Sequence, residues 1–140
     1  MTEPGRPYVG IVVVSHSRQL AAGVVELAAQ MAAPELAIVA VGGAPDGGLG
    51  TDADGIAAAI RAADSGHGVV VLADLGSAIL ATDAAIETLT ADLAARVRIS
   101  GGPIAEGAVV AAVQASIGES LDAVLGAAEA ARDLDKGVAR

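Results

Sequence analysis

Short apolar runs alternate with helix-like segments along the chain. The runs are rich in β-branched residues and cover residues 11–14, 36–41, 69–72 and 97–99. Between them, apolar residues recur three and four positions apart, as on one face of a helix. Strands that alternate with helices are typical of βαβ units and a mostly parallel sheet. We therefore expect one α/β domain over residues 1–140, an open, mostly parallel four- to five-stranded sheet flanked by helices.

The same pattern predicts a buried face for each helix. We expect helices over 18–32, after Thr51, after Ser77, over 104–117 and over 119–134. The predicted buried faces are Leu20, Val24, Leu27 and Met31 in the first helix, Ile56 and Ile60 in the second, and Ile79, Ile86 and Leu89 in the third. Thr51 is predicted to cap the second helix at its N-terminus.

A histidine follows the first apolar run. Residues 11–14 stop at Ser15-His16-Ser17, and a helical pattern begins at about Arg18. In open α/β sheets, ligands and reactive groups gather beyond the carboxyl ends of the strands. Position alone leaves two interpretations of His16 open, a reactive group or a surface residue of a capping loop.

Parallel strands bring four loops to the same edge of the sheet. These are residues 15–17, 42–50, 74–77 and 100–103. There Asp74 could accept the Nδ1–H of His16, which leaves Nε2 free as a nucleophile. Gly76 and Ser77 lie at a helix start, where free N–H groups favour anionic oxygens. Arg18 could neutralise a phosphoryl oxygen or simply be solvated. Together, the histidine, the aspartate and the helix start at this edge predict transient transfer of a phosphoryl group to His16.

Other chemistries fit the sequence less well. The single lysine, Lys136, excludes a P-loop, and no Gly-x-Gly-x-x-Gly follows the first run. A triad of Ser77, His16 and Asp74 lacks the Gly-x-Ser-x-Gly elbow and has the wrong chain order for an α/β-hydrolase. Two histidines without cysteine argue against a metal site. His67 is expected to be an exposed turn residue at the opposite edge.

Composition narrows the classes of partner. The net charge is −9, aromatic residues make up 1% and basic clusters are absent, which argues against nucleic acids and anionic membranes. A basic protein partner remains compatible with this charge. There is no cysteine for disulfides, no leader-like N-terminus and no run near the ~20 apolar residues of a membrane helix. We therefore expect a cytoplasmic protein.

Four motifs together carry a family resemblance. They are Val-Val-Val-Ser-His-Ser at 12–17, Gly-Thr-Asp-Ala at 50–53, Asp-Leu-Gly-Ser-Ala at 74–78, and Glu-Gly-Ala-Val-Val-Ala-Ala at 106–112. In this order, over about residues 8–130, the chain resembles the phosphotransferase subunit of phosphoenolpyruvate-dependent dihydroxyacetone kinase. That family is related to the mannose-type IIA domains of the sugar phosphotransferase system (PTS).

The resemblance implies a function and a site. It implies a homodimer in which His16 accepts a phosphoryl group from the phosphocarrier HPr and passes it to ADP on the nucleotide-binding subunit of the kinase. Asp74 would orient His16. The residues expected to bind the phosphoryl group are Ser15, Ser17, Leu75, Gly76 and Ser77. No bound cofactor or metal is expected, only a transient phosphohistidine.

Two alternatives stay open. One is a mannose-type IIA component of a sugar-uptake system, although those relatives tend to have Thr-His-Gly where this chain has Ser15-His16-Ser17. The other is a non-catalytic regulatory module whose phosphohistidine only changes its binding partner. Because the chain ends at Arg140, we expect HPr and enzyme I to be separate proteins.

Overall fold

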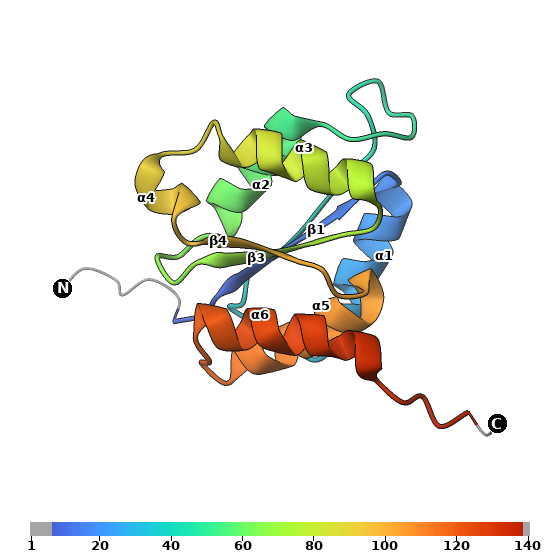
Figure 1. The fold of residues 1–140 in the computed structure, drawn as a ribbon, viewed down its shortest axis with the longest axis vertical. Helices are drawn as coiled ribbons and strands as arrows, with labels where there is room; N and C mark the ends of the chain where they lie inside the picture. The colour runs from blue at the N-terminus through green and yellow to red at the C-terminus, as the bar shows by residue number, and fades with distance from the viewer. Residues whose placement is uncertain (1–6, 139–140) are drawn as a thin grey trace.

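Strands and helices alternate along the chain in a computed structural model, which describes residues 7–138 (Figure 1). The strands are β1 (Gly10–Ser15), β2 (Ile38–Gly42), β3 (Val69–Ala73) and β4 (Val97–Ser100). The helices are α1 (Arg18–Ala29), α2 (Ala53–Ala63), α3 (Gly76–Ile86), α4 (Ala91–Ala94), α5 (Ile104–Ser116) and α6 (Leu121–Ala130), followed by a 3₁₀ turn at Ala131–Asp133. Within residues 7–138, no helix is long and apolar enough to cross a membrane.

The four strands form one parallel sheet in the order β2-β1-β3-β4. The register pairs Ile11 with Ile38 on one side and with Val70 on the other. The expected open parallel sheet is confirmed. Because β1 and β3 are central neighbours, the loops that leave their carboxyl ends are also neighbours.

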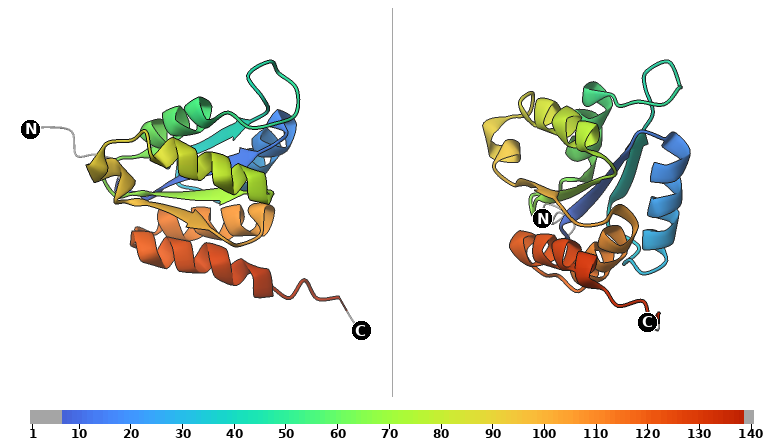
Figure 2. Two further views of the ribbon diagram at one scale, coloured as in Figure 1. Left: turned by 45° about the horizontal axis from the view of Figure 1, so that its top comes forward. Right: turned by 45° about the vertical axis from the view of Figure 1, so that its right-hand side comes forward.

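Helices cover both faces of the sheet. Ile11 and Val13 of β1 pack in a core cluster with residues of α1, α5 and α6. Val12 and Val14 pack on the other face with residues of α2, α3 and α4. Figures 1 and 2 show these two helical layers with the strands between them. Central strands that are buried on both faces need an unbroken apolar run, which explains the β-branched sequence of residues 11–14.

The predicted buried face of α1 is wrong at three of its four positions. Val24 is buried, but Leu20, Leu27 and Met31 are exposed. The buried residues of α1 are Ala21, Val24 and Ala28. The true face is turned by one residue, or about 100°. Alanines let α1 lie close to the sheet and to α5, which a pattern based on large apolar side chains does not reveal.

Three other local predictions also need correction. The fully buried residues of α3 are Ala78, Thr82 and Ala85, whereas the predicted Ile79 is exposed. Ile86, at the end of α3, and Leu89, after it, are half-buried and pack against the core as predicted. Asp52, not Thr51, caps α2, since its side chain accepts the N–H of Asp54. Asp52, one position after the predicted cap, thus provides the acceptor for a free backbone N–H at the start of the helix. The second predicted C-terminal helix is α6, which is shorter than 119–134.

Close packing explains the glycine of the 106–112 motif. A Cβ at Gly107 would lie 2.5 Å from Leu72 Cδ2 and 3.3 Å from the carbonyl oxygen of Ala128. Residue 107 must therefore lack a side chain so that α5 can pack between β3 and α6.

Candidate functional site

The carboxyl ends of β1 and β3 hold the site. Val14 pairs with Ala73, and the N–H of Asp74 donates to the Val14 carbonyl at 3.2 Å. The residues that follow each strand, His16 and Asp74, are thereby brought together. Ser17 caps α1 by accepting the N–H of Leu20 at 3.1 Å, so the chain turns from strand to helix within two residues.

The buried side of the His16 ring is bonded to Asp74. Nδ1 of His16 lies 2.9 Å from Oδ1 of Asp74, which confirms the contact expected from the topology. Asp74 also accepts three further bonds, from the N–H of His16 at 3.0 Å, the N–H of Leu75 at 2.8 Å and the hydroxyl of Ser15 at 2.8 Å. An ionised carboxylate only accepts, so this network assigns a proton to Nδ1, and in the neutral imidazole Nε2 is then the unprotonated nitrogen.

Burial and hydrogen bonding act on Asp74 in opposite directions. Burial alone would raise the pKa of this carboxyl group. The bonds from the His16 N–H, the His16 ring, the Ser15 hydroxyl and the Leu75 N–H outweigh burial and hold the pKa below its usual value. Asp74 is therefore ionised at neutral pH and can stabilise positive charge on the ring.

The other side of the ring faces outward. Nε2 of His16 is hydrogen-bonded to the hydroxyl of Ser77, and the imidazole is 25% exposed. With the proton on Nδ1, Nε2 accepts this bond and Ser77 donates it. A group that reacts with Nε2 must take the place of the Ser77 hydroxyl, which belongs to an exposed residue.

The residues expected to bind a phosphoryl group divide into two sets. The Ser15 hydroxyl and the Leu75 N–H are bonded to Asp74, and the Ser17 N–H is bonded to the Ser15 oxygen. In contrast, Gly76 and Ser77 are the first two residues of α3, and their N–H groups make no hydrogen bond within residues 7–138. All five residues lie around His16 and Asp74. Among the described residues, the backbone N–H groups of Gly76 and Ser77 and the hydroxyl proton of Ser17, whose oxygen accepts the Leu20 N–H, remain as donors for an anion.

The β2–α2 loop is tied to the site. The N–H of Gly50 donates to the His16 carbonyl at 2.9 Å. A Cβ at Gly42 would lie 2.7 Å from the carbonyl oxygen of Ser17, so only glycine fits where β2 passes the His16 loop. The loop projects beside the start of α1 (Figure 2). Leu49 lies in this loop and is 81% exposed.

Arg18 lies beside the β2–α2 loop, whereas His67 lies far from the site. The guanidinium of Arg18 rests against the loop at Gly43 and Gly47 and, among the described residues, forms no ion pair. With Leu49 it lines a shallow pocket of about 260 Å³. His67 is exposed in the turn before β3, at the opposite edge of the sheet, as expected.

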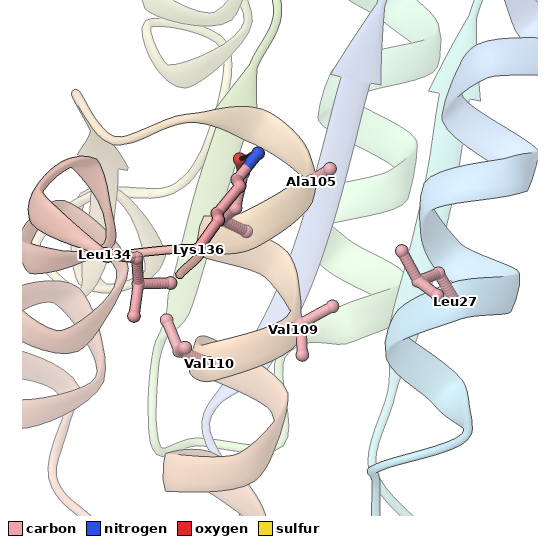
Figure 3. A pocket seen from close by; sticks show the side chains of 7 residues that line it. Leu27, Ala105, Val109, Val110, Leu134 and Lys136 are labelled. Atoms are coloured by element: carbon pink, nitrogen blue, oxygen red, sulfur yellow. Dashed lines mark ion pairs between the residues drawn. The ribbon is translucent and has the colours of Figure 1, made fainter. Parts of the chain in front are cut away.

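A larger pocket lies away from His16. It has a volume of about 490 Å³ and lies between α1, α5 and the segment after α6 (Figure 3). Leu27, Val109 and Leu134 contribute apolar side chains, and Lys136 pairs with Glu106 at 2.6 Å. Its lining is apolar apart from this ion pair, so it offers no set of groups for phosphoryl chemistry.

Sequence reasoning missed the contact between Ser15 and Asp74. A serine that ends a wholly buried strand and is itself fully buried must direct its hydroxyl to a specific partner. The available signal was the unbroken apolar run before Ser15, which implies burial at position 15. The sequence could not show that the partner is Asp74.

Comparisons with known proteins identify a family for this chain. The family model EIIA-man, described as the PTS system fructose IIA component, matches residues 10–125. The phosphoryl donor subunit DhaM of the PEP-dependent dihydroxyacetone kinase of Escherichia coli K12 is 40% identical over 121 residues. That match covers 84% of this chain but only 25% of the relative. The DhaM subunit of kinase 2 of Listeria innocua is 37% identical over 117 residues, which cover 84% of this chain and 94% of the relative.

Solved structures show the same fold. A crystal structure of a protein of unknown function superposes with a TM-score of 0.82 at 34% identity, covering 94% of this chain and 99% of the other. A phosphotransferase system component EIIA from Streptococcus agalactiae superposes with a TM-score of 0.66 at 16% identity, covering 94% of this chain and 96% of the other. The chain therefore belongs to the EIIA-man family of the phosphotransferase system and, within it, to the phosphoryl donor subunits named DhaM.

Proposed function

We propose that this protein is a cytoplasmic phosphohistidine carrier of dihydroxyacetone kinase. It accepts a phosphoryl group from HPr on His16 Nε2 and passes it to ADP on the nucleotide-binding subunit of the kinase. The observation that supports this most is the orientation of the ring, with Nδ1–H held by Asp74 and Nε2 facing outward. The relatives that are named as donor subunits of this kinase favour it over a sugar-uptake role.

The transfer is a pair of displacements at phosphorus. In the first, the Nε2 lone pair of His16 forms the N–P bond while the N–P bond of the donor breaks and its electrons return to the donor imidazole. The proton stays on Nδ1, and Asp74 stabilises the charge that develops on the ring. In the second, an oxygen of the ADP β-phosphate attacks phosphorus, the electrons of the His16 N–P bond return to Nε2, and ATP forms.

The start of α3 would receive the phosphoryl oxygens. The N–H groups of Gly76 and Ser77 have no partner within the described part of the chain, and the Ser77 hydroxyl already reaches Nε2. A helix N-terminus favours anionic oxygens through its free donors and its dipole. We therefore propose that Gly76 and Ser77 bind the phosphoryl oxygens. Ser17, at the start of α1, would also bind them.

Donor and acceptor would dock in turn over the same surface. Leu49 precedes Gly50, which bonds the His16 carbonyl, and Leu75 follows Asp74. They are 81% and 63% exposed, and the exposed Leu80 lies one turn into α3. Arg18 is the one cation beside the His16 motif in a chain of net charge −9. Because phosphorylation adds negative charge, each partner would supply cationic groups, and the complexes should be transient and weaken with salt.

A second exposed apolar face supports the proposed homodimer. Leu20 and Leu27 lie exposed on α1, Met31 lies exposed just after its end, and Leu27 also lines the pocket beside α5 (Figure 3). We propose that a second copy covers this face. Leu27→Asp should convert a dimer into a monomer in sedimentation velocity, whereas a wild-type monomer would contradict the proposal.

Reconstitution tests the function. Wild-type protein, enzyme I, HPr and phosphoenolpyruvate should give an acid-labile phosphate, and adding the two other kinase subunits with ADP and dihydroxyacetone should give dihydroxyacetone phosphate. His16→Gln should abolish both, whereas His67→Gln should leave both unchanged. Phosphate that persists in His16→Gln would place the phosphoryl group elsewhere.

Chemical-shift mapping tests the shared surface. Separate titrations with HPr and with the nucleotide-binding subunit should perturb the same signals around Leu49 and Leu75. Two footprints that do not overlap would exclude a relay in which the partners alternate on one surface.

A further inference from the structure

Ser15 is a polar side chain with no contact to solvent. It is the last residue of β1 and is fully buried. Its oxygen accepts the N–H of Ser17 at 3.0 Å and lies 2.8 Å from Oδ2 of Asp74. An ionised carboxylate cannot donate, so the single hydroxyl proton of Ser15 must point to Asp74. The two bonds together leave one orientation for this hydroxyl.

The Ser15 hydroxyl completes the set of donors around Asp74. Oδ1 accepts from the His16 ring and the Leu75 N–H, whereas Oδ2 accepts from the His16 N–H and the Ser15 hydroxyl. A carboxylate has about four lone-pair sites, so all are occupied. Two of the donors are backbone groups and one is the reacting ring itself. Ser15 is therefore the remaining side chain that fixes the plane of the carboxylate.

We propose that Ser15 is a positioning residue for phosphoryl transfer, because its hydroxyl holds Asp74 with Oδ1 toward His16 Nδ1 and so keeps Nε2 unprotonated. This inference rests on the proposed function of His16 as the phosphoryl carrier. It assigns Ser15 a role through Asp74 rather than a contact with the phosphoryl group, since its hydroxyl is buried and already engaged.

Ser100 provides a matched comparison in the same sheet. It is the last residue of β4, is 1% exposed, and accepts the N–H of Gly102 at 3.0 Å, two residues ahead, as Ser15 does with Ser17. Within residues 7–138, however, its hydroxyl bonds no carboxylate. Substituting either serine by alanine leaves a backbone N–H without its acceptor, but only the change at Ser15 removes a donor from Asp74.

The first experiment reads the protonation of His16 without any partner. ¹⁵N NMR of the imidazole in the full chain should show Nδ1 protonated and Nε2 unprotonated in the wild type. In Ser15→Ala the fraction protonated at Nε2 should rise. In Ser15→Thr, which keeps the hydroxyl, and in Ser100→Ala, the ring signals should match the wild type.

The second experiment measures the rate of phosphoryl transfer from phosphorylated HPr in a single turnover. Ser15→Ala should slow the transfer about tenfold, the scale of one hydrogen bond to a charged group. Ser15→Thr should restore it to within about twofold of the wild type. Ser15→Cys, similar in size but a weak donor, should behave like Ser15→Ala, which separates the loss of the donor from the loss of volume.

The outcomes separate this inference from the proposed function. Ring signals that stay unchanged in Ser15→Ala, or that change equally in Ser100→Ala, would overturn the positioning role. A wild-type protein that takes no phosphate from HPr would contradict the proposed function, while the ring signals would still decide the role of Ser15. If no Ser15 variant folds, a Ser15 hydroxyl proton in rapid exchange with water in the wild type would also overturn the inference.

Discussion

The two edges of the sheet each hold a carboxylate of similar construction. Asp74 follows β3 at the carboxyl edge, and Asp64 ends α2 at the amino edge. Each side chain is 11% exposed. Asp64 accepts two bonds from Arg96, from Nε at 3.0 Å and from Nη2 at 2.7 Å, and one from the Gly66 N–H at 3.1 Å. In both cases the pKa of the carboxyl group lies below its usual value.

The partners of the two carboxylates differ in charge. Arg96 is always protonated, so Asp64 is neutralised permanently by a two-bond ion pair. Asp74 faces an imidazole that is neutral when it carries one proton, and its negative charge is matched only when the ring becomes positive. A lowered pKa therefore does not identify a functional carboxylate by itself. What distinguishes the two is whether the bonded group can change its charge during a reaction.

The largest effect should follow from Asp74→Asn. The amide oxygen could still accept the Nδ1–H of His16, but the amide nitrogen would then face the Ser15 hydroxyl and the His16 N–H, which are both donors. The variant also loses the charge that stabilises the phosphorylated ring. We expect transfer from phosphorylated HPr to fall about a hundredfold or more in rapid-quench assays, while the protein stays folded by circular dichroism. Unchanged transfer in a folded variant would remove Asp74 from the mechanism.

Asp64→Asn should give the opposite result. Arg96 would lose its ion pair and one of its two bonds, although the amide oxygen can still accept the Gly66 N–H. We expect the free energy of unfolding to fall by about 1–2 kcal/mol in urea titrations. The Tm should fall by roughly 3–8 °C. Phosphoryl transfer below the Tm should match the wild type, and a slowed transfer would show that the two edges are coupled.

The pairing of His16 with Asp74 could be predicted because it depends only on topology. Parallel strands in adjacent positions bring their carboxyl ends together, whatever the details of packing. The Asp64–Arg96 pair could not be predicted in this way. Arg96 follows the short helix α4, and its contact with Asp64 depends on the path of that segment back to β4.

Packing faces were the less predictable part of the fold. In α1 the pattern of large apolar residues favoured Leu20, Leu27 and Met31, but Ala21 and Ala28 face the core. Alanine is common on every side of such helices, so periodicity does not single out the closely packed stripe. The direction of the Ser15 hydroxyl also lay beyond the sequence, since it depends on the position of one carboxylate oxygen.

A smaller effect is expected from Ser77→Ala, on the open side of the ring. The hydroxyl donates to Nε2 and, in the phosphorylated protein, would donate to a phosphoryl oxygen. Since Ser77 is exposed and the backbone donors of α3 remain, we expect transfer to slow about fivefold, with no change in Tm. The ratio of wild-type to variant transfer rate should be larger for Asp74→Asn than for Ser77→Ala. The difference measures how much more the buried side of the His16 ring contributes to transfer than the open side. Equal losses of transfer rate in the two variants would contradict the larger contribution expected from the Asp74 side of the ring.

The smallest effect should appear as the difference between Asp64→Asn and the wild type in acid. A carboxyl group whose pKa is lowered in the folded state stabilises the protein above its unfolded pKa, near 3.8, and loses that contribution as the pH falls through the folded value. The wild-type free energy of unfolding should therefore decline below about pH 4. Asp64→Asn has no such group at position 64, so its decline should be shallower, and the gap between the two proteins should narrow.

Urea titrations from neutral pH to pH 3 measure this gap. Asp74 contributes a decline of the same sign to both proteins, because its pKa is also lowered, so the difference between them isolates Asp64. A gap that stays constant down to the lowest pH would mean that Asp64→Asn destabilises by lost packing and not by the lost ion pair with Arg96. Such a result would remove the electrostatic basis for comparing the two edges.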